Sequence, residues 1–181
     1  MNLPNRLTLL RMCLVPVFVA CFYLDAVLPW WNLLAAAVFL LASATDLVDG
    51  WYARKHALVT DFGKLLDPMA DKLLFCSAFI MLVGTGELEP LFAIVFVGRE
   101  FIISAFRLIA VEHGTVIAAG RLGKLKSLFQ CIAVALILLG NPLFGRIGVP
   151  MDGIVLYIAL VLTVWSLVDY LVKNRKMVHG A

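Results

Sequence analysis

The sequence predicts an all-α integral membrane protein with six transmembrane helices in a single domain, residues 1–181. Its composition indicates a lipid setting, because 63% of the residues are hydrophobic and only 15% are charged. Soluble domains contain about 25% charged residues. The apolar residues also gather in six stretches, each near the roughly 20 residues that a helix needs to cross a bilayer.

The six apolar stretches follow one another along the chain. They cover residues 4–24, 30–54, 61–84, 89–112, 121–141 and 150–172. Glycine, proline and polar residues separate them, in short connections such as 84–90 and 141–150, and these residue types end helices or form turns. No connection is long enough to form a second domain.

The basic residues favour one side of the predicted bundle. Lys and Arg gather at the start of the first stretch, around connections 55–60 and 113–120, and at the C-terminus, whereas the alternate connections contain only Arg146. By the positive-inside rule both termini are cytoplasmic. No transit peptide is apparent, so we expect the protein to lie in a bacterial inner membrane rather than in an organelle. We expect no nucleic-acid partner.

Four aspartates form the densest acidic segment of the chain. They are Asp46 and Asp49 near the end of the second stretch and Asp67 and Asp71 near the start of the third. Each pair lies on one face of a helix. Charged groups at membrane depth are costly, and four carboxylates without matching cations repel one another. Divalent cations compensate this charge, so the sequence predicts a site for two Mg²⁺ or Mn²⁺ ions. Such a pair of ions can clamp a phosphoryl group. The site is expected to face the cytoplasm.

Small residues and one arginine accompany the acids. Gly50 and Ala53 share the face of the first aspartate pair, and Gly63 shares the face of the second. Without large side chains, these positions let a nucleotide or diphosphate lie close to the helices. Arg54 can reach phosphate oxygens.

The complete pattern, Asp46-x2-Asp49-Gly50-x2-Ala53-Arg54-x8-Gly63-x3-Asp67-x3-Asp71, resembles the signature of the CDP-alcohol phosphatidyltransferases without a departure. The resemblance implies a six-helix fold, usually a homodimer, that uses two divalent metals. It implies a reaction in which an alcohol displaces CMP from a CDP-linked lipid. In the family's pattern all four aspartates bind metal, Asp71 is also the base, and Gly50, Ala53, Arg54 and Gly63 hold the CDP group.

Four segments, one of which overlaps the signature, narrow the acceptor alcohol. Residues 2–11, 63–72, 99–107 and 123–130 look like the bacterial phosphatidylglycerophosphate synthase branch of this family. That branch implies CDP-diacylglycerol and sn-glycerol 3-phosphate as substrates, and phosphatidylglycerophosphate and CMP as products. Cardiolipin synthases share parts of these segments, so they and inositol-phosphate transferases remain as alternatives.

The dianionic phosphate of glycerol 3-phosphate requires cations placed apart from the metals. Arg99, Arg107, Lys124 and Lys126 are the candidates. Arg99 could instead pair with an acid on a neighbouring helix, since Glu100 is expected to face elsewhere. Lys124 and Lys126 could simply follow the positive-inside rule. The cations alone do not exclude a cardiolipin synthase, whose lipid acceptor also carries phosphate.

Asn5, Thr8 and Arg11 recur at helical spacing on one face of the first stretch, either to seat it at the membrane surface or to line the nucleotide and lipid cleft. A different class of protein, a divalent-cation channel or transporter, could also use the aspartates as an ion site. In such a protein Gly50, Ala53 and Arg54 would have no role. We therefore expect the enzyme.

Overall fold

The computed structural model describes residues 3–56, 61–112, 120–141, 144–145 and 148–174. For some helical residues the structure describes the backbone alone and not the side chain. These are residues 3–7, 46–56, 61–68, 112 and 121. The described residues form six helices and no strand, which confirms the predicted all-α class.

The helices follow the predicted apolar stretches closely. They are α1 (Leu3–Phe22), α2 (Trp31–His56), α3 (Asp61–Gly84), α4 (Pro90–Glu112), α5 (Arg121–Leu138) and α6 (Met151–Lys173). After α5, Gly140 and Asn141 have φ values of 68° and 53°, a left-handed conformation that these two residue types tolerate. Pro90 occupies the first position of α4, where its missing N–H breaks no helical hydrogen bond.

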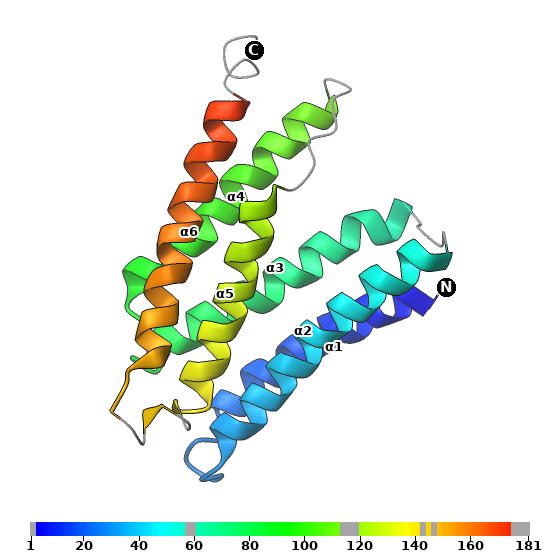
Figure 1. Ribbon diagram of the computed structural model, residues 1–181. Coiled ribbons are helices and arrows are strands. Elements are labelled where there is room, and N and C mark those ends of the chain that lie inside the picture. Colours follow the sequence, from blue (N-terminus) through cyan, green and yellow to red (C-terminus); the bar gives the residue numbers. More distant parts are fainter. Residues whose placement is uncertain (1–2, 57–60, 113–119, 142–143, 146–147, 175–181) are drawn as a thin grey trace.

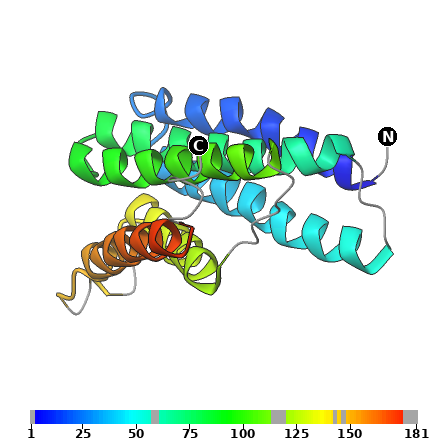
Figure 2. The same cartoon turned by 90° about the horizontal axis from the view of Figure 1, so that it is seen from above.

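The helices form two packed groups (Figure 1). α1 packs along α2 and also contacts α3, while α5 and α6 form the other closely packed pair. α4 contacts both α3 and α6 and so joins the groups, and Figure 2 shows the α5–α6 pair set to one side of the other helices. Because α2 ends and α3 begins on the same side of the bundle, the helical segments that carry the aspartates lie at the same end of the molecule (Figure 1).

Aromatic side chains connect α1, α2 and α3 to α4 through the core. Rings from four helices follow one another with centroids 5.0–6.2 Å apart: Phe18 of α1, Phe39 of α2, Phe75 and Phe79 of α3 and Phe96 of α4. Their planes are tilted or perpendicular, the arrangement that the ring quadrupoles favour. Fully buried alanines on α2, such as Ala35 and Ala42, let its neighbours approach closely.

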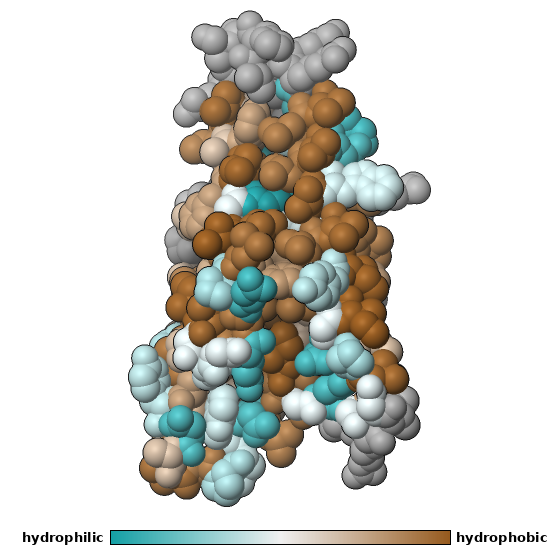
Figure 3. Space-filling model, turned by 90° about the vertical axis from the view of Figure 1, so that its left-hand side faces the viewer, coloured by the Kyte–Doolittle hydropathy of each residue, from teal (hydrophilic) through white to brown (hydrophobic). Residues whose placement is uncertain are grey.

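The bundle exposes many large apolar side chains that a soluble protein would bury. On α6 the buried face includes Thr163 and Ser166, whereas Val161, Trp165 and Val168 are exposed. The face shown in Figure 3 is apolar across the middle of the molecule. Soluble monomers rarely expose apolar patches of this extent, so the outer surface favours a lipid environment.

Among the described residues, one helix is both long enough and apolar enough throughout to cross a membrane. This helix is α6, and two shorter apolar segments, Thr8–Phe22 and Trp31–Thr45, lie in α1 and α2. The six predicted helices are therefore confirmed within the described residues, whereas six membrane crossings and the cytoplasmic position of both termini stay predictions.

Candidate active site

The aspartates lie on two adjacent helices. Asp46 and Asp49 belong to the C-terminal half of α2, Asp67 and Asp71 belong to the N-terminal half of α3, and the two helices contact each other. The helical register puts each pair on one face of its helix. Their backbone positions are therefore compatible with a shared site between α2 and α3.

Asp71 is the one metal candidate whose side chain is described, and it is partly buried. The side chains of most other predicted metal and CDP ligands lie outside the described part of the structure: Asp46, Asp49, Asp67, Asn5, Gly50, Ala53, Arg54 and Gly63. Among the described side chains no three acidic, histidine or cysteine groups converge.

Arg11 of α1 forms hydrogen bonds with α2 in the turn that precedes Asp46. Its side chain is buried, and Nε donates to the carbonyl oxygen of Ala42 at 3.3 Å and to Oγ1 of Thr45 at 3.4 Å. Thr8, one turn earlier on α1, is fully buried. The buried cation of Arg11 thus joins α1 to α2 at Thr45, the residue directly before Asp46.

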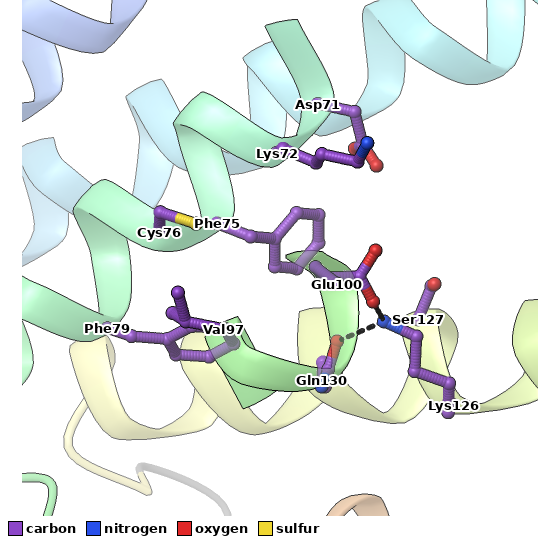
Figure 4. A pocket seen from close by; sticks show the side chains of 10 residues that line it. All are labelled: Asp71, Lys72, Phe75, Cys76, Phe79, Val97, Glu100, Lys126, Ser127 and Gln130. Carbon is purple, nitrogen blue, oxygen red and sulfur yellow. Dashed lines mark hydrogen bonds and ion pairs between the residues drawn. The ribbon is translucent and has the colours of Figure 1, made fainter. Parts of the chain in front are cut away.

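A pocket lies next to Asp71, between α3, α4 and α5 (Figure 4). It is lined by Asp71, Lys72, Phe75, Cys76, Phe79, Val97, Glu100, Lys126, Ser127 and Gln130. In Figure 4 the carboxylate of Glu100 lies between the Asp71–Lys72 end and the ammonium of Lys126. Lys72 Nζ donates to Ser104 Oγ at 2.5 Å, which links α3 to α4 beside Asp71.

A buried cationic cluster adjoins this pocket, and Glu100 is its shared anion. Glu100 Oε1 accepts from Arg99 Nη1 at 2.9 Å and from Lys126 Nζ. The expectation that Glu100 faces away from Arg99 was wrong. Neighbouring positions on a helix diverge by about 100°, but these two side chains are long enough for their charged ends to meet.

Neutral groups complete the contacts of the cluster. Lys126 Nζ donates to Gln130 Oε1 at 3.0 Å, and Gln130 Nε2 donates to Thr163 Oγ1 at 3.2 Å. Arg99 Nη2 donates to Ser166 Oγ at 3.2 Å. Because these partners lie on α4, α5 and α6, the network fixes three helices around the pocket.

The four predicted acceptor cations fall into two pairs. Arg99 and Lys126 are 8% and 3% exposed and share one carboxylate, whereas Arg107 and Lys124 are exposed. The structure therefore brings Arg99 and Lys126 together, and it keeps Arg107 and Lys124 outside this cluster.

Gly123 of α5 lies against the guanidinium of Arg99. A Cβ atom at Gly123 would be 3.4 Å from Arg99 Nη2. A methyl group fits at this separation, but a larger side chain would displace the guanidinium. The absence of a side chain at Gly123 thus leaves room for Arg99 between α4 and α5.

A comparison with protein families settles the class of this chain. The family model described as CDP-alcohol phosphatidyltransferase matches residues 1–165. The chain belongs to the CDP-alcohol phosphatidyltransferase family. The match contains α1 to α5, both aspartate pairs and the buried cationic cluster. The resemblance inferred from the aspartate signature is confirmed.

Similar members of the CDP-alcohol phosphatidyltransferase family come from several bacteria. A Bacillus subtilis protein named CDP-diacylglycerol–glycerol-3-phosphate 3-phosphatidyltransferase is 42% identical over 183 aligned positions, which cover 96% of this chain and 95% of the relative. A Rickettsia felis protein of the same name is 37% identical, covering 97% and 96%. A Mycobacterium tuberculosis protein named probable phosphatidylglycerophosphate synthase is 38% identical, covering 99% and 84%.

Membership of the CDP-alcohol phosphatidyltransferase family explains two features of the structure. The enzymes of this family are membrane-associated, which agrees with the apolar outer surface of the bundle. They generally depend on divalent metals, which agrees with a concentration of carboxylates on α2 and α3.

Proposed function

We propose that this enzyme transfers the phosphatidyl group of CDP-diacylglycerol to sn-glycerol 3-phosphate, giving phosphatidylglycerophosphate and CMP. The observation that carries the proposal is the similarity over nearly the whole chain to relatives named for this reaction. The intact aspartate signature supports it, because the residues required for the chemistry are present at the family's spacing.

We propose that Asp46, Asp49, Asp67 and Asp71 hold two Mg²⁺ or Mn²⁺ ions. Their placement on adjoining helices supports the proposal, as does the preference of these ions for carboxylate oxygens. When bound, the two ions would neutralise charge on the transferred phosphoryl group and on the departing CMP.

Asp71 is proposed to act also as the general base. Its partly buried side chain lines the pocket beside Lys126, which supports a place near the acceptor hydroxyl. Asp71 takes the proton of the 1-hydroxyl of glycerol 3-phosphate, and the resulting oxygen forms a bond to the β-phosphorus of CDP-diacylglycerol. The bond from that phosphorus to the bridging oxygen breaks, and CMP leaves with the bonding electrons.

The CDP group is proposed to lie along α2 and α3, close to Gly50, Ala53 and Gly63, with Arg54 on its phosphates. Asn5 and Thr8 are proposed to complete the cleft from α1. The contact of α1 with both α2 and α3 supports this assignment, as does the full burial of Thr8 one turn before Arg11, which bonds to α2.

Arg99 and Lys126 are proposed to bind the phosphate of the acceptor, with Arg107 and Lys124 attracting it from outside. Support comes from the burial of Arg99 and Lys126 beside the pocket that Asp71 lines. Lys126 and Asp71 line the same pocket, so the phosphate of the acceptor is proposed to lie at Lys126 and its 1-hydroxyl near Asp71. Charge-assisted hydrogen bonds to a dianion are strong in such a partly desolvated site.

The proposed setting is a bacterial inner membrane crossed six times, with both termini and the active site on the cytoplasmic side. The acyl chains of the substrate would lie in the inner leaflet beside the apolar outer faces of the helices. We propose a homodimer as the assembly, in keeping with the family pattern.

The test offers labelled CDP-diacylglycerol and Mg²⁺ to the purified enzyme with one acceptor at a time. The acceptors are glycerol 3-phosphate, phosphatidylglycerol and inositol phosphate, and the measurement is release of CMP together with the identity of the lipid product. The proposal requires phosphatidylglycerophosphate from glycerol 3-phosphate. Turnover with one of the other acceptors and none with glycerol 3-phosphate would contradict it.

A further inference from the structure

Glu100 occupies the centre of the buried cationic cluster. One of its oxygens accepts hydrogen bonds from both Arg99 and Lys126. The side chains of Arg99 and Lys126 are 9% and 4% exposed, and that of Glu100 is 22% exposed. Two buried positive charges this close together repel each other, so the carboxylate between them stabilises their common position.

Both cations keep hydrogen-bonding capacity after these contacts. Among the residues that the structure describes, Nε of Arg99 is buried and has no hydrogen-bond partner. An ammonium group has three N–H donors, and the contacts of Lys126 with Glu100 and Gln130 account for two of them. Lys126 can therefore donate to one further acceptor atom, and Arg99 keeps the N–H of Nε and one N–H on each terminal nitrogen.

The position of Glu100 relates this cluster to the reaction. Glu100 and Lys126 line the same pocket as Asp71 (Figure 4). An ion network that served only to join α4, α5 and α6 would not need to border the pocket or to leave a buried guanidinium donor unsatisfied. These two observations favour a role in binding an anion there.

We infer that Glu100 is a positioning residue for the acceptor: it holds Arg99 and Lys126 side by side so that their remaining donors bind the acceptor's phosphate. Glu100 itself does not contact the substrate. The inference rests on the proposed function, because it takes the dianionic phosphate of glycerol 3-phosphate as the group that these donors bind.

The test replaces the carboxylate by an amide of nearly the same volume, Glu100→Gln. The amide oxygen can still accept from one cation, but the charge that holds the second cation is gone. We expect KM for glycerol 3-phosphate to rise about tenfold or more, while kcat and KM for CDP-diacylglycerol change by less than about twofold. The matched control is Glu89→Gln, an exposed glutamate before α4, which should leave all three constants unchanged.

A double-mutant cycle separates positioning from a general structural effect. Lys126→Met removes one of the two cations that Glu100 holds. If Glu100 acts through Lys126, the rise in KM for the double variant should fall at least about threefold below the product of the two single effects. Effects that multiply independently would overturn the inference.

Thermal unfolding of each purified variant in detergent shows whether the bundle persists. If Glu100→Gln does not fold, Glu100→Asp provides the same test, because it keeps the charge but withdraws it by one methylene group. We expect about a threefold rise in KM for glycerol 3-phosphate with little change in kcat.

The outcomes distinguish this inference from the proposed function. If the wild-type enzyme releases no CMP with glycerol 3-phosphate, the proposed function fails. If the wild-type enzyme is active and the folded Glu100 variants keep its KM for glycerol 3-phosphate, only the role of Glu100 fails. A fall in kcat with both KM values unchanged would also overturn that role, because it would place Glu100 in the chemical step.

Discussion

The acidic helices α2 and α3 and the cationic cluster of α4, α5 and α6 differ in how the chain builds them. The acidic region is assembled from residues 46–71, in two neighbouring helices. The cationic region joins Glu100 to Lys126 and Gln130 to Thr163, residues separated by 26 and 33 positions. A local motif thus identifies the family, whereas tertiary contacts arrange the groups that we assign to the acceptor.

This difference predicts different failures for the two regions. Damage to the acidic region should abolish the chemical step, because every acceptor would need the same metal-bound phosphoryl group. Damage to the cationic cluster should weaken binding of one substrate and leave the chemistry largely intact. The variants below test this division, from the largest expected effect to the smallest.

Metal removal should have the largest effect. Dialysis of the purified enzyme against EDTA should reduce CMP release to background, because the carboxylates alone cannot neutralise the transferred phosphoryl group. Addition of Mg²⁺ or Mn²⁺ should restore it, and the helical circular dichroism should persist throughout. Full activity without divalent cations would remove the acidic region from the chemistry.

Asp71→Asn should reduce kcat by about 10³-fold or more, since the amide can neither accept the acceptor's proton nor supply a negative ligand. The measurement is steady-state CMP release by the folded variant. Asp25→Asn, in an exposed connection, is the matched control and should retain full activity. A kcat within tenfold of that of the wild type would show that Asp71 is not the base.

The buried and exposed cations should differ from each other. Lys126→Met should raise KM for glycerol 3-phosphate by about 30-fold, because it removes a desolvated cation from the pocket. Lys124→Met and Arg107→Met should raise it by less than about threefold, because solvent screens exposed charges. Equal effects for all three variants would contradict the separation of the cations into two pairs.

Substitutions at Gly123 should have smaller effects than the loss of Lys126. Gly123→Ala adds a methyl group at ordinary contact distance from Arg99, and KM for glycerol 3-phosphate should stay within about twofold of that of the wild type. Gly123→Val should raise this KM about fivefold, because its branched side chain displaces the guanidinium. A Val variant with wild-type kinetics would show that the position of Arg99 matters little.

Much of the fold could be predicted from the sequence. Long apolar stretches interrupted by Gly and Pro predict helices and their approximate ends, and the helices from Leu3–Phe22 to Met151–Lys173 follow those stretches. Their packing could not be predicted in the same way. In a helix that is apolar all round, hydropathy does not distinguish the buried face from the outer face, so the contact of α1 with α3 was not foreseen.

The candidate site also has one part that the sequence predicts and one part that it does not. The spacing of Asp46, Asp49, Asp67 and Asp71 is a local property, and helical geometry converts it directly into two faces. The partnership of Glu100 with Lys126 depends on how α5 packs against α4, which no local spacing determines. Its one signal in the sequence is a glutamate next to Arg99 inside an apolar helix, where an unpaired charge would be costly.

The most direct test of the account is the location of the metal ions. Crystals of the purified enzyme grown with Mn²⁺ and CDP-diacylglycerol would reveal the ions by anomalous scattering. The account predicts two anomalous peaks between α2 and α3, about 3.5–4 Å apart, within coordination distance of Asp46, Asp49, Asp67 and Asp71. Ordered aspartates with no peak between them, or manganese bound elsewhere beside the diphosphate, would contradict it.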